Sequence, residues 1–198
     1  MILFIEIVGV CIFSYISGSI PTALIVSRRF KRVDIRAVGD GNMGARNSFH
    51  SLGPKFGWLV AAVDFIKGAI PVLLAYLLGL EIEWQFLAGV IAILGHDFPI
   101  FASFKGGQGT ATSLGTMMVL FPIPTTIGLA VYGLLFLIIR NSNISLSIGG
   151  GIIALIVGIS MLWLQLIYAV CVFLFIPIKQ QIDSPRRKAI AAAKKPNS

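Results

Sequence analysis

The sequence predicts an all-α integral membrane protein, built as a bundle of about seven transmembrane helices. The chain has 198 residues, of which 57% are hydrophobic and only 12% charged, whereas a soluble domain carries roughly 25% charged residues. Its mean hydropathy is +0.91. The apolar residues form continuous blocks, which favour helices because a membrane barrel alternates apolar and polar residues in segments of about 10. This pattern excludes an ordinary soluble enzyme, a disulfide-rich secreted module and a disordered tail.

The first apolar block, residues 2–27, ends at a basic segment. Residues 28–55 contain seven Lys and Arg against two Asp, a net charge of +5. Because positively charged loops stay in the cytoplasm, we place this segment inside and the N-terminus outside. Glu6 precedes the block and the basic cluster follows it, so we expect an uncleaved anchor rather than a signal peptide.

The middle of the chain is expected to hold three further spans, over 57–79, 85–104 and 109–121. The loop after the first of them contains two Glu and one Trp but no Lys or Arg, as is typical of an outside loop. The apolar part of the second span and the whole third segment are short for a bilayer, which needs about 20 residues. Pro122 and Pro124 are expected to turn the chain outside.

The last part of the chain is expected to hold a span over 125–139, then a helical hairpin over 144–160 and 161–178. Residues 179–198 carry six Lys and Arg against one Asp. We expect them to form a basic cytoplasmic tail on a single membrane-embedded domain, 1–178. Seven spans place the N-terminus outside and the C-terminus in the cytoplasm, and merging the short segments to give five spans keeps that orientation.

The net charge of +8 points to anionic membrane lipids rather than to nucleic acid, because the basic residues adjoin apolar spans. Cys11 and Cys171 lie far apart in apolar blocks without the spacing of metal ligands, so we expect small buried hydrophobes. The sequence therefore indicates neither a metal nor a cofactor.

A glycine-rich loop in the basic segment is the first candidate site. Its three glycines allow positive φ and let backbone N–H groups point at an anion. Arg side chains suit phosphate, and Asn side chains add amides. The loop's candidate binding residues are Arg36, Gly39, Gly41, Asn42, Gly44, Arg46 and Asn47. The alternative is a flexible loop whose basic residues hold lipid headgroups.

A second glycine-rich loop precedes the 109–121 segment. Lys105 is followed by glycines that lead into a small-residue helix, which resembles an anion-binding helix N-terminus. It is not a Walker loop, because no Gly-Lys-Ser/Thr closes it. Its candidate residues are Lys105, Gly106, Gly107, Gln108 and Gly109. The alternative is a tight turn whose small residues serve helix packing.

Ionisable residues inside the spans are the third candidate feature. Asp64 and Lys67 are three residues apart on one helix face, and we expect a structural ion pair. His96 is expected either to brace the second glycine loop or to contact the substrate. The sequence has no Cys–His pair and no Gly-x-Ser-x-Gly, so an enzyme at this site would work by positioning and charge neutralisation.

Residues 15–148 resemble the bacterial acyl-phosphate:glycerol-3-phosphate acyltransferases, the PlsY family. The matching positions are Gly18-Ser19-Ile20-Pro21, Val33-Asp34-Ile35-Arg36, Gly39, Gly41-Asn42, Gly44-Ala45, Asn47, Leu52-Gly53, Asp64, Lys67-Gly68, Gly95-His96, Phe98-Pro99, Phe104-Lys105-Gly106-Gly107, Gly109 and Ala111-Thr112. Ser145 resembles a later family element and is a further candidate binding residue. The resemblance implies a seven-helix bundle in the bacterial plasma (inner) membrane, with its active site facing the cytoplasm.

The resemblance also implies the reaction. The family transfers a fatty acyl group from acyl phosphate to the 1-hydroxyl of glycerol 3-phosphate, which gives lysophosphatidic acid and phosphate in phospholipid synthesis. Lys105 then stabilises negative oxygens, and the glycines of its loop bind glycerol phosphate. Two alternatives stay open: a diverged paralogue that binds or acylates a related phosphorylated acceptor, and a small-anion transporter.

Several positions depart from the family pattern. The family has Ser at Asp40, Thr at Arg46, Arg at His50 and Lys at Gln108, and its late His and Asn fall on Ile178 and Gln181. We expect Asp40 and His50 to act with Lys105 in catalysis, Asp40 as a base, and Gln181 to keep the amide chemistry of Asn. Arg46 lies four residues before His50, so phosphate-binding charge is expected to have moved one helical turn.

Overall fold

The computed structural model describes residues 1–160 and 163–193, and this part of the chain is helical without a strand. Seven of its α-helices are α1 (Ile2–Ser19), α2 (Thr22–Val26), α3 (Ala45–Leu52), α4 (Pro54–Leu77), α5 (Ile82–Asp97), α6 (Thr110–Leu120) and α7 (Pro122–Ile139). They are followed by α8 (Ser142–Ile159) and α9 (Trp163–Ala193). The predicted all-α membrane class is confirmed.

Each expected span has a helical counterpart, but not every one is long enough to cross a bilayer. Within the described residues, six apolar stretches have the length and composition of membrane spans: Ile2–Lys31, Pro54–Leu77, Ile82–Ala102, Pro122–Ile139, Ser142–Ile159 and Trp163–Ile190. Helix α6 has only 11 residues, about 16 Å at 1.5 Å per residue. The count of seven spans therefore stays a prediction.

The first apolar block is interrupted where Pro21 separates α1 from α2. Proline has no backbone N–H and cannot continue the hydrogen-bond ladder of α1. A π-helical turn, Ser27–Lys31, carries the chain out of the bundle, and Arg32 ends it in the left-handed region at φ 54°. The apolar block over residues 2–27 is therefore divided between two helices, α1 and α2.

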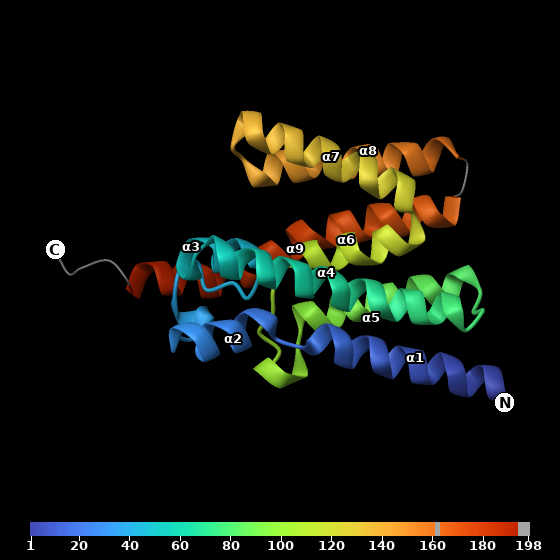
Figure 1. Ribbon diagram of the computed structural model, residues 1–198, viewed down its shortest axis with the longest axis horizontal. Coiled ribbons are helices and arrows are strands. Elements are labelled where there is room, and N and C mark those ends of the chain that lie inside the picture. Colours follow the sequence, from blue (N-terminus) through green and yellow to red (C-terminus); the bar gives the residue numbers. More distant parts are fainter. Residues whose placement is uncertain (161–162, 194–198) are drawn as a thin grey trace.

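The helices pack in two groups (Figure 1). Helices α1, α4, α5, α6 and α9 lie side by side, and the α7–α8 hairpin lies along one side of them. Close approach relies on small residues: a Cβ on Gly68 would meet the carbonyl oxygen of Thr112, and one on Gly115 would meet that of Phe65. Such contacts are typical of membrane helix pairs.

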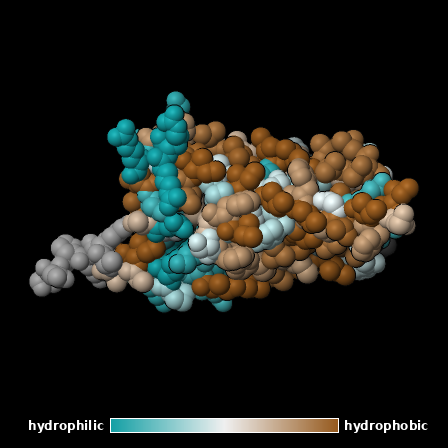
Figure 2. Space-filling model, turned by 90° about the horizontal axis from the view of Figure 1, so that it is seen from below, coloured by the Kyte–Doolittle hydropathy of each residue, from teal (hydrophilic) through white to brown (hydrophobic). Residues whose placement is uncertain are grey.

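Polar residues gather at one end of the bundle, on the left in Figures 1 and 2, while apolar side chains cover most of the length visible in Figure 2. This end, called the loop end, contains residues 20–53, 98–109, 140–142 and the last part of α9. Apolar side chains elsewhere are exposed, as expected where lipid replaces water.

Helix α9 differs from its prediction. The expected boundary at residue 178 falls inside the helix, and residues 179–193 continue it to the loop end. Lys179 is 1% exposed, so this part is packed rather than a free tail. The inward side chains follow spacings of three and four residues: Ala169, Val172, Ile176, Lys179 and Asp183. This periodicity keeps one face of α9 against the bundle.

Candidate functional site

The first glycine loop is organised by Asn47, which is 2% exposed. Its Nδ2 donates to the carbonyl oxygens of Ile35, Val38 and Asn42 at 3.0–3.2 Å. Its Oδ1 accepts from the Asp40 N–H and the Ser51 hydroxyl, both at 3.1 Å. Because both ends of the amide are engaged, the structure gives Asn47 a loop-positioning role in place of the predicted phosphate contact.

Gly39 and Gly41 have φ values of +59° and +73°, as predicted from the glycine spacing, whereas Gly44 starts α3 with φ −108°. A Cβ on Gly39 would meet Asn47 Oδ1. The side chain of Asn42 is 4% exposed, and no described residue hydrogen-bonds its Oδ1. Asn42 therefore offers an acceptor at the centre of the loop.

Arg36 is anchored by Asp34. Its Nε and Nη2 donate to the two carboxylate oxygens at 3.0 and 2.7 Å, and Arg28 donates to Oδ2 at 2.9 Å. The hydrogen bonds from Arg36 hold the pKa of the Asp34 carboxyl well below its ordinary value. The same contact raises the pKa of Arg36. The predicted phosphate ligand Arg36 is thus held in place with a charged partner.

Asp40 joins the loop to α9. Its Oδ1 accepts from the Asn42 N–H at 3.0 Å, and its Oδ2 accepts from Arg187 Nη2 at 2.9 Å. Nearby, Ile190 packs on Gly41, where a Cβ would clash with Ile190 Cδ1. Both oxygens of the predicted catalytic base are therefore engaged, and the last turns of α9 close over the loop.

The second glycine loop differs from its prediction. The N–H groups of Gly106 and Gly107 donate to the carbonyl oxygens of Asp97 and His96, both at 3.2 Å. These two N–H groups satisfy the free carbonyls at the end of α5 and are therefore not directed at an anion, while the binding of phosphate by Gly106 and Gly107 stays a prediction. A Cβ on Gly107 would meet His96 Nε2, so His96 braces the loop as one of its two expected roles.

Lys105 is exposed and has no ion-pair partner in residues 1–160 and 163–193. The preceding Ser103 and Phe104 both lie in the left-handed region, with φ 56° and 58°. Such backbone costs energy for residues other than glycine and is often found at functional sites. The structure therefore presents Lys105 as a free cation on a strained turn.

The start of α6 has an acidic side chain beside it. Asp97 is fully buried, and its Oδ1 lies 3.0 Å from the position of a Cβ on Gly109. A carboxylate near a helix N-terminus is favourable. Gln108 is half-buried beside it. The predicted anion pocket of the second loop is thus occupied on this side by a side chain of the protein.

The expected Asp64–Lys67 ion pair is confirmed. Lys67 Nζ lies 2.8 Å from Asp64 Oδ1 and donates to the Ile20 carbonyl oxygen at 2.8 Å. The Thr22 hydroxyl donates to the same Asp64 oxygen at 2.9 Å, and His96 Nδ1 lies 3.7 Å from it. These contacts fix the break between α1 and α2 under the loop end.

The other predicted site residues lie on α3, α8 and α9. Arg46 Nη1 donates to Asn143 Oδ1 at 3.2 Å, and His50 is exposed one turn further along α3. The buried Ser145 hydroxyl donates to the Asn141 carbonyl oxygen at 2.9 Å. Gln181 is exposed on α9, two residues from both Lys179 and Asp183, and is not brought to the loops.

Sequence reasoning missed three groups on α9: Lys179, Asp183 and Arg187. Lys179 Nζ donates to Asp183 Oδ2 at 2.6 Å and lies 4.9 Å from the centre of the Phe98 ring. Helix α9 therefore contacts the first loop through Asp40, and it contacts Phe98, which follows α5 and precedes the second loop. The available signal was the three- and four-residue spacing of inward positions, which continues past residue 178.

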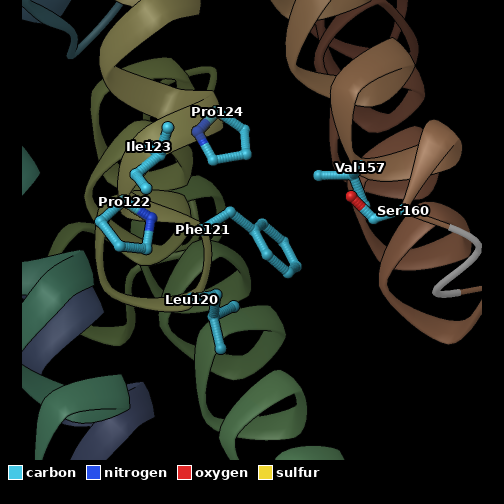
Figure 3. A pocket seen from close by; sticks show the side chains of 7 residues that line it. All are labelled: Leu120, Phe121, Pro122, Ile123, Pro124, Val157 and Ser160. Atoms are coloured by element: carbon cyan, nitrogen blue, oxygen red, sulfur yellow. The ribbon is translucent and has the colours of Figure 1, made fainter.

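An apolar hollow of about 230 Å³ lies away from this site. Figure 3 shows it between the turn that joins α6 to α7 and the last part of α8. Its lining residues are Leu120, Phe121, Pro122, Ile123, Pro124, Val157 and Ser160. Because α6 begins at the loop end and ends at this hollow, the hollow belongs to the opposite end of the bundle.

The fold and the loop end define a multi-pass membrane protein with a cationic site at one edge of the bundle. The sequence model of the family described as glycerol-3-phosphate acyltransferase matches residues 8–187. The chain belongs to the glycerol-3-phosphate acyltransferase family.

Relatives and solved structures agree with this membership. The glycerol-3-phosphate acyltransferase of Listeria monocytogenes serotype 4a (strain HCC23) is 36% identical over 175 residues, 87% of this chain and 88% of that protein. The Bacillus subtilis (strain 168) protein of that name is 42% identical over 139 residues, 70% and 72%. The crystal structure of PlsY (YgiH), an integral membrane glycerol 3-phosphate acyltransferase, in its glycerol 3-phosphate form matches with a TM-score of 0.80 at 32% identity, over 91% and 90%.

Proposed function

We propose that this protein transfers an acyl chain from acyl phosphate to the 1-hydroxyl of glycerol 3-phosphate, giving lysophosphatidic acid and phosphate. The observation that carries the proposal is that both glycine loops lie at one end of a membrane bundle, where α9 contacts Asp40 of the first loop and Phe98 before the second, in a chain of this family. Relatives are named glycerol-3-phosphate acyltransferase, and one solved structure is of a lysophosphatidic acid form. We place the site at the cytoplasmic face of the bacterial plasma membrane, because loops rich in Lys and Arg are retained on the cytoplasmic side.

Acyl transfer between these two substrates suits a site at the edge of the membrane. The acceptor is a soluble dianion, and the donor has a lipid tail and an anionic head. The acceptor oxygen forms a bond to the acyl carbon, the bond from that carbon to the phosphate oxygen breaks, and the hydroxyl proton is taken by a base. Because phosphate is a good leaving group, the protein contributes mainly orientation and neutralisation of charge.

The residues take separate roles in this proposal. Lys105, exposed and unpaired within the described chain, neutralises the oxygens of the departing phosphate. Arg36, Arg46 and the Asn42 amide face the acceptor from the first loop. His50, exposed one turn from Arg46, can take the hydroxyl proton. Asp40 is assigned a positioning role because Asn42 and Arg187 engage both of its oxygens.

The test uses the full chain in phosphatidylcholine nanodiscs with palmitoyl phosphate and glycerol 3-phosphate. We expect phosphate release that requires the acceptor, together with lysophosphatidic acid detected by mass spectrometry. Lys105→Ala should reduce kcat at least about 100-fold, the range of one oxyanion-stabilising group. Lys55→Ala is the matched control, since Lys55 is also exposed and lies in the first turn of α4, next to the loop end.

Two results would contradict the proposal. Phosphate release that does not depend on the acceptor would mean simple hydrolysis of the donor. Saturable glycerol 3-phosphate binding without turnover would favour the diverged paralogue that binds a related acceptor. The replacements at Asp40, His50 and Gln108 make this the second candidate.

A further inference from the structure

The last turns of α9 carry an arginine pair that no motif of the two glycine loops includes. Arg186 and Arg187 are consecutive, and both lie on the part of α9 that covers the first loop. The side chains of Arg187 and Asp40 are 29% and 31% exposed, so their contact lies at the mouth of the loop rather than in the core.

Arg187 has donors to spare. Only its Nη2 has a hydrogen bond within the described chain, to Asp40 Oδ2 at 2.9 Å. A guanidinium has five N–H donors arranged as a fork that suits phosphate. Asp40 therefore holds Arg187 by one nitrogen, and the remaining donors are available to an anion at the mouth of the loop.

Arg186 is under-satisfied in a different way. Its Nε and Nη2 are inaccessible to solvent and have no hydrogen-bond partner among the described residues, although Nη2 lies 3.4 Å from Asp183 Oδ1. Asp183 Oδ2 is already bonded to Lys179. Buried guanidinium nitrogens without a hydrogen bond cost free energy, which a bound anion would reduce.

The charges of this cluster do not cancel. Lys179, Arg186 and Arg187 are cations, and Asp183 and Asp40 are their carboxylate partners. One positive charge is left over. The buried Asn42 Oδ1, which lacks a donor in the described chain, adds an acceptor for a hydroxyl group in the loop that Arg187 contacts.

We propose that Arg186 and Arg187 form a binding site for a phosphate monoester, with Asp40 as the group that holds Arg187 in position until the phosphate binds. The site deepens the proposed function, because glycerol 3-phosphate is such a monoester. In this site α9 supplies the arginine charge that His50 does not provide in the first loop.

The test measures binding without turnover, so that it does not depend on the acyl donor. Glycerol 3-phosphate is titrated into the full chain in phosphatidylcholine nanodiscs and followed by calorimetry. Arg187→Gln and Arg186→Gln should each weaken binding about 10-fold or more, the loss expected for a charge-assisted hydrogen bond. Lys188→Gln removes the same charge from an exposed neighbour on α9 and should change the Kd less than about 2-fold.

The variant Asp40→Asn distinguishes a phosphate-binding site from a purely structural ion pair. If Asp40 only holds Arg187, Asp40→Asn leaves the guanidinium free, and the Kd stays the same or falls. If the pair is only a bridge between the loop and α9, Asp40→Asn and Arg187→Gln weaken binding equally, and the proposal is overturned. Should Arg187→Gln fail to fold, Arg187→Lys keeps the charge but loses the fork, and weaker binding with unchanged Tm supports the site.

Two sources of the monoester are distinguished by adding phosphatidic acid to the nanodiscs. Competition with glycerol 3-phosphate that Arg187→Gln abolishes assigns the site to a lipid headgroup as well as to the soluble ester. Absence of competition assigns it to the soluble ester. Binding that is unchanged in both arginine variants overturns the proposal even if the enzyme turns over. Inactivity with palmitoyl phosphate, alongside arginine-dependent binding, overturns only the proposed reaction.

Discussion

Lys179 Nζ and Asp183 Oδ2 lie 2.6 Å apart on successive turns of α9, and the lysine is 1% exposed. Breaking a buried ion pair leaves an uncompensated charge, which costs about 3–5 kcal/mol. We expect Lys179→Met to lower the free energy of unfolding of the detergent-solubilised protein by up to that amount, because Arg186 remains 3.4 Å from Asp183. The double variant Lys179→Met with Asp183→Leu should recover part of it, because the carboxylate is removed with the lysine, although Arg186 then loses its partner.

The control for this pair is Lys188→Met, which removes an exposed lysine from the same helix. Its melting temperature should match that of the unmodified protein. If Lys179→Met has the same melting temperature as the unmodified protein, the ion pair contributes nothing to the packing of α9.

Asn47 is expected to control the shape of the first loop. Asn47→Ala removes five hydrogen bonds and leaves buried carbonyl oxygens without donors, at a cost of at least about 2 kcal/mol. Hydrogen exchange over residues 35–47 should become much faster. Ser51→Ala removes only one of these bonds and should change exchange little; equal effects of the two variants would refute the central role of Asn47.

Arg46 tests whether phosphate-binding charge has moved along α3. Arg46→Ala should raise the KM for glycerol 3-phosphate about 10-fold or more and leave kcat within a few-fold, because ground-state and transition-state binding are lost together. Asn143→Ala removes the one partner of Arg46 in the described chain while keeping the charge. A KM that rises equally in both variants would instead assign the effect to the contact between α3 and α8.

The Asp34–Arg36 contact predicts a pH dependence of stability. The folded-state pKa of Asp34 is lowered from an ordinary value of 3.8, mainly by its hydrogen bonds from Arg36. Its contribution is therefore complete above the unfolded-state pKa and is lost as the pH falls below it, toward the folded-state pKa. Because the pair is half-exposed, it is worth at most about 1 kcal/mol.

The measurement compares melting temperatures of the unmodified protein and Asp34→Asn as the pH falls from about 6 to about 2.5. The difference should shrink steadily with acidification. Glu83→Gln, at an exposed position, should show a constant and near-zero difference over the same range. A difference that grows toward acid would contradict the lowered pKa of Asp34.

Gly115 is expected to set the spacing of α4 and α6. A Cβ there would meet the carbonyl oxygen of Phe65, which is backbone and cannot move aside. Gly115→Ala should therefore destabilise the protein by about 1–3 kcal/mol, the range for overpacking. Gly151→Ala, in a helix with open space around the new Cβ, should be neutral or stabilising by up to about 1 kcal/mol; a loss of similar size in both would contradict the packing argument.

Apolar blocks predicted most of the helices within a few residues, because hydrophobic length sets where a membrane helix forms, but they missed the end of α9. The expected 57–79 span is Pro54–Leu77, and 125–139 is Pro122–Ile139. The prolines that were expected to turn the chain instead stand in the first turn of α7, where a missing N–H removes no helical hydrogen bond. Proline therefore marked the start of a helix rather than a loop.

The site was less predictable, since its key contacts join residues far apart in the chain. Nothing local couples Asp40 to Arg187, which are 147 residues apart. The charge of Lys179 suggested that the membrane helix ends before it. In the structure Lys179 is buried against Asp183, and α9 continues past both residues. Glycine spacing correctly predicted positive φ at Gly39 and Gly41, but could not show that the Gly106 and Gly107 N–H groups are used to end α5.

Helix α9 runs for 31 residues, about 46 Å, which exceeds a hydrocarbon thickness of about 30 Å. Near one end Tyr168 stacks on Phe86, with ring centres 4.7 Å apart, and near the other Arg187 reaches the first loop. Because α9 has contacts near both of its ends, we expect a thinner or thicker bilayer to change the tilt of the whole helix. If Arg187 binds phosphate as proposed, we expect the acyl-chain length of the host lipid to change the affinity for that phosphate.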